Sequence, residues 1–260
     1  MCQVINEQID PQILKPSNLS NMKAMVFAAG LGTRLRPYTN DRPKALVEVQ
    51  GKTLLEIVLR RLKSFGIKEV VVNVHHYADM VEHYLFDKEY FGMRIHISDE
   101  REELLDTGGG LLKAKALLCD APFLIHNVDI ISDLDLNELY SHHERDPSLT
   151  TLAVRQRETS RYLEFDQHGR LSGWVNKRTG ERKVSREAQE ITEWAYRGMA
   201  IIDPALFAYF PSDKAVFSII EVWLEAAKHG FIRNFPHNES SWLDVGKPEA
   251  LERATKEFKL

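Results

Sequence analysis

The chain has 260 residues, enough for one α/β domain that buries a sizeable core. Its formal net charge of -4 gives no basic excess, which argues against a DNA- or RNA-binding protein. With two cysteines and no apolar run near the ~18–20 residues of a membrane-spanning helix, we expect neither a disulfide framework nor a membrane partner. The cytoplasm is the expected location, and any anionic ligand must be held by local cations.

The first 22 residues differ from the rest of the chain. They contain two prolines and several Asn and Gln residues, and they lack the basic start and apolar centre of a signal peptide. The periodic hydrophobic pattern begins right after Met22. We therefore expect residues 1–22 to form a flexible extension and residues 23–260 to form a single domain.

The first half of the chain alternates between two patterns. An apolar run at 23–29 predicts a buried strand, and the apolar face of residues 53–65 predicts a helix. The same reasoning predicts, in chain order, a strand at 70–74, a helix at 79–86, a strand at 93–97, a helix at 111–118 and a strand at 122–128. Strands that alternate with helices form parallel β-α-β units, so we expect a three-layer α/β/α fold with a doubly wound, mostly parallel, Rossmann-like sheet.

The second half is richer in strands. The pattern predicts strands at 150–155, 162–165, 171–175, 194–202 and 242–245, and helices starting near 204, at 216–229 and at 248–258. The charge-rich stretch at 176–192 is expected to be a loop. The sheet should therefore be mixed, with a small β-rich portion beside it, and no separate second domain is required.

A glycine-rich segment at 30–34 (GLGTR) follows the first strand directly. Glycines there let backbone N–H groups approach phosphates, Arg34 offers a planar fork for phosphate oxygens, and Lys44 offers a compact charge. The segment alone is also typical of a tight turn. A dinucleotide-binding loop is disfavoured, because Leu35 occupies the third glycine position and residues 73–75 (NVH) supply no acidic side chain. The spacing to Gly-Lys-Ser/Thr that common NTPase loops require is absent too.

Three more segments carry candidate ligand groups. Residues 106–110 (DTGGG) start a helix with three glycines that we expect to expose backbone donors, although such a run is also typical of a flexible connector. Asp129 ends a buried strand, which suits a Mg²⁺ ligand beside phosphates, although most Asp residues in such places cap helices or turns. Asp244 ends another short strand, and nothing in the spacing shows that it meets Asp129.

Together these segments resemble the sugar-1-phosphate nucleotidyltransferases, also called NDP-sugar pyrophosphorylases. The signature of that family is complete here in Gly30, Gly32, Thr33, Arg34, Pro37, Thr39, Pro43 and Lys44. The resemblance runs from about Lys23 to the terminal helix. It implies an enzyme that joins a sugar 1-phosphate to a nucleoside triphosphate and releases pyrophosphate, with Mg²⁺ as cofactor and the sugar beside the β-rich portion.

The resemblance also implies roles for single residues. Arg34, Lys44 and Asp129 are implied as catalytic residues, and Asp129 and Asp244 as metal ligands. Nucleotide contacts are implied for Ala28, Ala29, Gly30, Leu31, Gly32, Thr33, Arg34, Lys44, Thr107, Gly108, Gly109 and Asn127. Sugar contacts are implied for Asn127, Glu164 and Gly198. Three positions depart from the family pattern, because Asp106 replaces Glu, Val128 replaces Gly and Lys247 replaces Thr.

The substrate pair stays open between two possibilities. The triple glycine and the short C-terminus resemble the bacterial enzymes that make UDP-N-acetylmuramic acid, a cell-wall sugar nucleotide, from UTP. Guanylyl transfer from GTP to mannose or heptose 1-phosphate is the alternative. A non-catalytic nucleotide-sugar sensor is disfavoured, because the cations and carboxylates of the site are all present. The sequence indicates no nucleic-acid partner and leaves the oligomeric state open.

Overall fold

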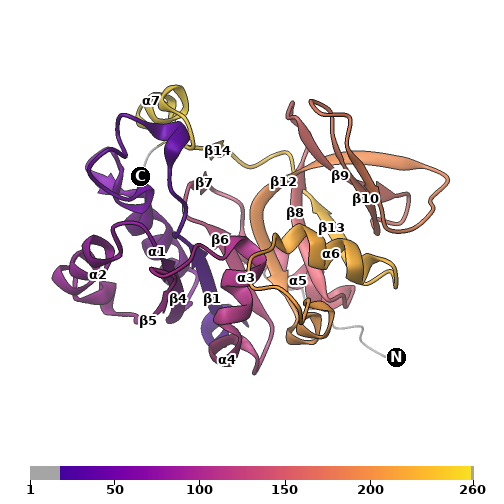
Figure 1. Cartoon of the computed structure of the whole chain (residues 1–260), viewed down its shortest axis with the longest axis horizontal. Coiled ribbons are helices and arrows are strands. Elements are labelled where there is room, and N and C mark those ends of the chain that lie inside the picture. Colours follow the sequence, from indigo (N-terminus) through magenta and orange to yellow (C-terminus); the bar gives the residue numbers. More distant parts are fainter. Residues whose placement is uncertain (1–17, 259–260) are drawn as a thin grey trace, which may run out of the picture.

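The computed structural model describes residues 18–258, built around a ten-stranded mixed sheet (Figure 1). The strand order is β11-β10-β9-β12-β6-β1-β4-β5, with β8 paired to β12 and β13 paired to β8. Four adjacent strands are parallel, namely β5 (Arg94–Asp99), β4 (Glu69–Val74), β1 (Lys23–Phe27) and β6 (Phe123–Asn127). This half confirms the predicted doubly wound arrangement, and its carboxyl ends meet at one edge of the sheet.

The long strand β12 (Ile191–Ile202) joins the parallel half to the β-rich portion. Its last residues pair antiparallel with β6, and its first residues pair with β9. The strands around it are β8 (Thr150–Arg155), β9 (Arg161–Asp166), β10 (Leu171–Asn176), β11 (Arg182–Val184) and β13 (Ile232–Pro236). We call β9, β10 and β11 with their connections the arm. Its strand β11 lies inside the stretch predicted as a loop, because Arg182 to Val184 pair with β10.

Alternating side chains of the central strands divide the core into two layers. In β1, Ala24 and Val26 pack into one hydrophobic cluster and Met25 packs into the other. Helices α1 (Leu54–Ser64), α2 (Ala78–Asp87), α5 (Leu136–Arg145) and α7 (Pro248–Glu257) contribute to the first cluster. Helices α3 (Asp106–Lys113), α4 (Lys115–Leu118) and α6 (Ile219–Ala227) contribute to the second. Helices therefore cover both faces of the sheet, which confirms the three-layer prediction.

Several short elements were not predicted. They are the strands β2 (Glu48–Val49), β3 (Lys52–Thr53) and β7 (Ile130–Ser132), of which β7 pairs with β14 (Trp242–Asp244). The unpredicted 3₁₀ turns are η1 (Asn18–Asn21), η2 (Thr33–Leu35), η3 (Lys44–Leu46) and η4 (Glu89–Gly92). The helix predicted to start near 204 is present as the 3₁₀ turn η5 (Pro204–Tyr209). Helix α5 and strand β13 were missed as well. Thr53 caps helix α1, since its hydroxyl accepts a hydrogen bond from the Glu56 N–H at 3.1 Å.

The start of the folded part lies earlier than predicted. Leu19 and Met22 were placed in the flexible extension, yet both are buried in the first hydrophobic cluster. Burying these apolar side chains favours order over the loose conformation that we expected. The remainder of the predicted extension, residues 1–17, lies outside the described residues. Among the described residues, no helix combines the length and hydropathy that crossing a membrane requires.

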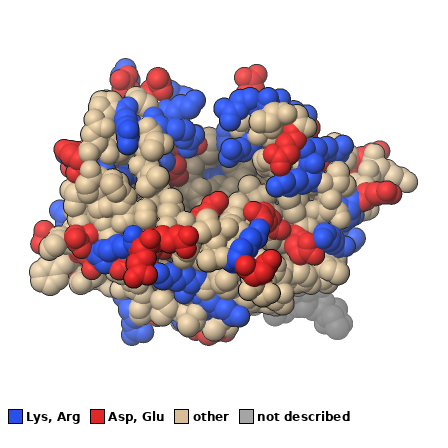
Figure 2. Space-filling view, viewed as in Figure 1, with Lys and Arg blue, Asp and Glu red and all other residues tan. Residues whose placement is uncertain are grey.

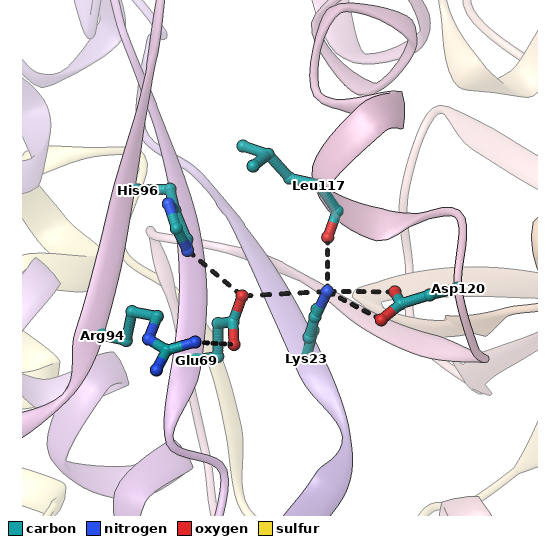
Figure 3. A network of polar contacts seen from close by, with 6 residues as sticks. All are labelled: Lys23, Glu69, Arg94, His96, Leu117 and Asp120. Atoms are coloured by element: carbon teal, nitrogen blue, oxygen red, sulfur yellow. Dashed lines mark hydrogen bonds and ion pairs between the residues drawn. The ribbon is translucent and has the colours of Figure 1, made fainter.

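A polar network fastens the amino-terminal ends of the parallel strands (Figure 3). Lys23, the first residue of β1, donates from Nζ to Asp120 after α4 and lies 3.7 Å from Glu69 Oε1 at the start of β4. His96 Nε2 of β5 lies 3.1 Å from the same Glu69 oxygen. The hydrogen bond to Asp120 raises the pKa of Lys23. This network therefore lies at the edge of the sheet opposite to the one where the site is found.

Candidate active site

Two adjoining cavities open at the carboxyl ends of the central strands. The first has a volume of about 460 Å³ and the second about 660 Å³. Asn127 and Asp129 line both, so the end of β6 marks the junction between them. In the space-filling view a hollow separates two raised parts of the surface, with Lys and Arg side chains on both of its sides (Figure 2). An elongated ligand with two different ends suits this pair of cavities.

The predicted glycine loop forms a wall of this site. Ala28, Ala29 and Gly30 line the first cavity. Within residues 18–258, the backbone N–H groups of residues 30–33 have no hydrogen-bond acceptor. Gly32 has a φ of +65°, and a Cβ there would lie 3.0 Å from Thr39 Cγ2. The loop thus presents free donors of the kind that hold phosphate oxygens.

A buried network that the sequence analysis missed fixes the base of the loop. Asn73 at the end of β4 accepts at Oδ1 from the N–H groups of Ala28 and Ala29, at 2.7 and 3.3 Å. It donates from Nδ2 to Glu100 Oε1 at 2.7 Å. The other carboxylate oxygen of Glu100 accepts from the Leu105 N–H at 3.1 Å, just before α3. Asn73 therefore ties together the ends of three parallel strands, and Glu100 extends the network to the start of α3.

The predicted cations and carboxylates converge at the junction of the cavities. Lys44, which is 9% exposed, donates from Nζ to Asp129 Oδ2. A Cβ added to Gly246 would lie 2.7 Å from Asp244 Oδ1, 3.0 Å from Arg34 Nη2 and 3.4 Å from Lys44 Nζ. Two positive and two negative side chains therefore surround this glycine, although they come from segments far apart in the chain.

The pairing of β7 with β14 brings the two carboxylates together. Asp244 lies opposite Ile130 in this pairing, and the Val245 N–H donates to the Asp129 carbonyl oxygen at 2.9 Å. The Gly246 N–H donates to Asp244 Oδ1 at 2.9 Å and so fixes the rotamer of that side chain. Burial, and next the negative charge of Asp129, raise the pKa of Asp244, while the nearby Lys and Arg charges oppose the shift.

This carboxylate pair suits a divalent cation. Two close carboxylates repel each other, and a cation between them would relieve the repulsion that raises the pKa of Asp244. Mg²⁺ in particular is held by one or two carboxylates together with waters and substrate phosphates. The described residues contain no cluster of three or more Asp, Glu, His or Cys side chains able to enclose a metal. The residues present therefore fit an ion that takes its remaining ligands from the substrates.

The three glycines at the start of α3 were expected to expose backbone donors to a ligand, but they allow close packing instead. The N–H groups of Gly108 and Gly109 both donate to the carbonyl oxygen of Phe217, at 2.9 and 3.2 Å. A Cβ on Gly109 would lie 2.0 Å from the Ala215 carbonyl oxygen. These glycines let the segment before α6 pack against α3, so their donors are already used. Thr107, by contrast, lines the first cavity.

The second cavity receives only part of the predicted sugar-binding set. Gly198 lines it with a φ of +80°, and a Cβ there would lie 2.6 Å from Ile130 Cγ1. Glu164 does not line it, because its buried carboxylate accepts from Arg182 Nε at 2.9 Å within the arm. Among the described residues, Glu164 therefore pairs with Arg182 and does not line the second cavity. Lys247, noted as a departure from the family pattern, does line it.

Aromatic side chains form much of the second cavity and were not predicted as site residues. They are Tyr162, Trp174, Tyr196, Trp223 and Trp242. The hydroxyl oxygen of Tyr196 and the indole nitrogen of Trp223 are buried and have no hydrogen-bond partner among the described residues. Trp residues in a chain are more often packing than binding groups, so composition alone gave no signal. Only the fold shows that these rings surround a cavity.

Comparison with known proteins decides the family. The family model described as nucleotidyl transferase matches residues 23–259. The chain belongs to this family. It is 38% identical over 237 residues to the N-acetylmuramate alpha-1-phosphate uridylyltransferase of Caulobacter vibrioides, an alignment that covers 87% of this chain and 93% of that protein. It is 30% identical to a mannose-1-phosphate guanyltransferase of Yarrowia lipolytica, with 88% of this chain and 61% of that protein covered.

Solved structures show the same fold at low sequence identity. HddC from Yersinia pseudotuberculosis complexed with GMP-PN superimposes with a TM-score of 0.74 at 21% identity, covering 92% of this chain and 100% of that one. A putative glucose-1-phosphate thymidylyltransferase from Bacillus anthracis gives a TM-score of 0.75 at 18% identity, covering 92% and 97%. The predicted family and fold are therefore confirmed, and the chain is an enzyme of the sugar-phosphate nucleotidyltransferase class.

Proposed function

We propose that this nucleotidyltransferase makes UDP-N-acetylmuramic acid from UTP and N-acetylmuramic acid 1-phosphate, with release of pyrophosphate. The main support for this reaction is that two cations and two carboxylates converge where the two cavities meet. They are Arg34, Lys44, Asp129 and Asp244. The choice of substrates is supported by the 38% identical relative from Caulobacter vibrioides, of which this chain covers 93%. Because both substrates are highly charged, we keep the cytoplasm as the expected location.

The two cavities suggest where the substrates lie. The nucleoside would occupy the first cavity beside Thr107, with its phosphates over the open N–H groups of residues 30–33. The sugar would occupy the second cavity beside Gly198, whose missing side chain leaves room next to Asn127. Its phosphate would then reach the junction between the cavities. This placement would put the sugar phosphate next to the α-phosphate of UTP.

The reaction needs positioning and charge stabilisation more than covalent help. An oxygen of the sugar phosphate attacks the α-phosphorus of UTP in line, the bond to the β-phosphate breaks, and pyrophosphate leaves. In this proposal Arg34 would neutralise the leaving pyrophosphate, and Lys44 would stabilise the charge on the α-phosphate. No general base is needed, because the attacking phosphate oxygen is already an anion.

Asp129 and Asp244 are the residues that would hold Mg²⁺. The ion, when bound, supplies positive charge to the phosphate oxygens at the junction. Lys44 contacts Asp129, so the lysine also keeps that carboxylate oriented toward the junction. Other members of the nucleotide-binding set, Leu31 and Thr33 among them, remain proposals that rest on their place in the loop.

Pyrophosphate release tests this proposal. The assay uses the full chain with Mg²⁺, each of UTP, GTP, CTP, ATP and dTTP, and N-acetylmuramic acid, mannose or heptose 1-phosphate. We expect turnover with UTP and the muramic acid substrate, and a loss on the order of ~10²-fold for Arg34→Ala. Arg36→Ala is the matched control, since this exposed arginine of the same loop lines neither cavity. Wild-type turnover in Arg34→Ala would contradict the role given to Arg34.

Guanylyl transfer to mannose 1-phosphate is the second candidate, favoured by the 30% identical relative from Yarrowia lipolytica. Pyrophosphate release with GTP and a mannose or heptose phosphate would keep the mechanism and replace the substrates. Tight nucleotide binding with no release for any pair would instead indicate a nucleotide-sugar sensor. Both outcomes are read from the same panel, so one experiment separates the three possibilities.

A further inference from the structure

The second cavity has an excess of positive charge on the side that faces away from the glycine loop. Five Lys or Arg residues line this cavity, against two carboxylates, Asp129 and Asp244. Arg34 and Lys247 belong to the loop side. Arg157, Arg161 and Arg178 belong to the other side. Arg157 lies in the connection from β8 to β9, Arg161 is the first residue of β9, and Arg178 lies between β10 and β11. Figure 2 shows Lys and Arg side chains on both sides of the hollow.

These three arm arginines differ from most other cations of the arm. Lys177 pairs with Glu193, Arg182 pairs with Glu164, and Arg186 pairs with Asp166. Within residues 18–258, by contrast, Arg157, Arg161 and Arg178 form no ion pair with any carboxylate. Most arm cations outside the cavity lining are therefore neutralised, with Arg170 as an exception, whereas the three that line the cavity have no carboxylate partner among the described residues.

Arg157 gives the sharpest sign that a ligand is missing. Its Nε atom is buried and has no hydrogen-bond acceptor among the described residues. Its guanidinium carbon lies 4.6 Å from the centroid of the Trp242 ring, and that ring is itself anchored by a 2.8 Å hydrogen bond from Trp242 Nε1 to the Arg197 carbonyl oxygen. Burial lowers the pKa of Arg157, and the charge of Asp244 opposes this. A buried donor held in place without an acceptor calls for an anionic partner.

We propose that Arg157, Arg161 and Arg178 form a subsite for a carboxylate that the sugar 1-phosphate carries in addition to its phosphate. This inference rests on the proposed function, since it concerns the sugar end of the same site. In the proposed function, Arg34, Lys44 and the cation that the carboxylates would hold bind the phosphate at the junction, so the arm arginines would be left for a second anion. A guanidinium matches a carboxylate with two parallel hydrogen bonds. N-acetylmuramic acid 1-phosphate has such a group in its lactyl ether.

The test compares two sugars that differ only in the lactyl group. The full chain with saturating UTP and Mg²⁺ is given N-acetylmuramic acid 1-phosphate or N-acetylglucosamine 1-phosphate, and kcat/KM is measured for each by pyrophosphate release. We expect the wild type to favour the acidic sugar by ~10-fold or more, the scale of a charged hydrogen bond. Arg161→Gln and Arg178→Gln, both at exposed positions, should each lower that ratio by ~10-fold. Arg157→Gln should do the same, with Arg157→Lys as the variant that retains the charge.

Arg170→Gln is the matched control, because this exposed arginine lies in the β9–β10 turn of the arm and lines neither cavity. Its ratio should equal that of the wild type. A wild-type ratio near one, or variants that lower kcat/KM equally for both sugars, would overturn the inference and leave the arginines as phosphate ligands. No turnover with either sugar would instead contradict the proposed function. Calorimetric titration of the two sugar phosphates would then still decide whether the arginines select the acidic one.

Discussion

Replacing Asn73 with Ala should damage both stability and nucleotide binding, because this side chain supports the glycine loop from beneath. The change removes the acceptor of the Ala28 and Ala29 N–H groups and the donor to Glu100. Asn73 is 3% exposed and Glu100 is 1% exposed, so water has little access to replace these bonds. The consequences can be worked out bond by bond.

Each buried group left without a partner costs about 1–3 kcal/mol. The Ala28 bond at 2.7 Å and the Glu100 bond at 2.7 Å lie in the normal range, while the Ala29 bond at 3.3 Å is long and belongs at the low end. The sum for Asn73→Ala is about 3–5 kcal/mol, a large share of the ~5–15 kcal/mol that stabilises a typical protein. For a chain of this size it corresponds to a fall in Tm of about 10 °C.

Urea unfolding and UTP titration measure the two effects. For Asn73→Ala we expect the free energy of unfolding to fall by about 3–5 kcal/mol. We also expect the KM for UTP to rise by ~10-fold, because the loop at residues 30–33 loses the hydrogen bonds that hold Ala28 and Ala29. Asn40→Ala is the matched control, because Asn40 is exposed and its side chain forms no hydrogen bond with the described residues, so its stability should change by less than about 0.5 kcal/mol. A loss below about 1 kcal/mol in Asn73→Ala would refute the reasoning that these bonds are shielded from water.

Asn73→Asp sharpens the test by keeping the acceptor and changing the charge. The new carboxylate would face Glu100 at the distance where Asn73 Nδ2 now donates, 2.7 Å. Two carboxylates this close raise the pKa of the pair, so the folded state binds a proton more tightly than the unfolded state. Stability should therefore be lost as the pH rises through that raised pKa, and the variant should approach the wild type more closely at pH 5 than at pH 8. An equal deficit at both pH values would contradict this.

Three further predictions follow from other positions. Burial, and next the charge of Arg61, lower the pKa of His126 to about 4. Between pH 7 and pH 5 the unfolded state takes up a proton that the folded state does not, so the free energy of unfolding should fall by about 2 kcal/mol. His126→Gln should remove this part of the pH dependence of urea unfolding. Gly198→Ala should lower Tm and raise the KM for the sugar phosphate more than that for UTP, because its Cβ meets Ile130. Asp244→Asn should raise the Tm of the metal-free protein while lowering turnover by ~10²-fold, because the raised pKa of Asp244 makes its ionised form unfavourable in the folded state. A Tm below that of the wild type would contradict the last argument.

The parallel half of the fold could be predicted because each of its elements carries its own signal. Strands β1, β4, β5 and β6 are short apolar or alternating runs, and α1 has both a cap and an apolar face. The rule that ligands bind at the carboxyl ends of such strands then placed the glycine loop and Asp129 at the site. These inferences needed only local patterns and one general rule of topology.

The rest depended on contacts between segments distant in the sequence. The meeting of Asp129 and Asp244 follows from the pairing of β7 with β14. Strand β14 was predicted, but the three-residue strand β7 was not, and no local pattern indicates that the two pair. The glycines of α3 were expected to expose backbone donors, and only the position of Phe217 shows that the N–H groups of Gly108 and Gly109 are already bonded. Glu164 looked free to contact a sugar until its partner Arg182 was seen across the arm. Charge and glycine content indicate what a segment can do, whereas tertiary packing decides which of its groups remain available.

The availability of charged groups gives one physical account of both halves of the site. Lys44 and Asp129 lie close together at the junction, and Asp244 is held beside them by the Gly246 N–H although the repulsion raises its pKa. On the far side, Arg157 forms no ion pair with any carboxylate among residues 18–258. Such arrangements lower the stability of the empty protein, and the missing charges would arrive with the ligands, a cation at the carboxylates and an anion at the arginines. Ligand binding should then raise Tm in two separable parts, since Mg²⁺ with UTP relieves the first and the acidic sugar relieves the second.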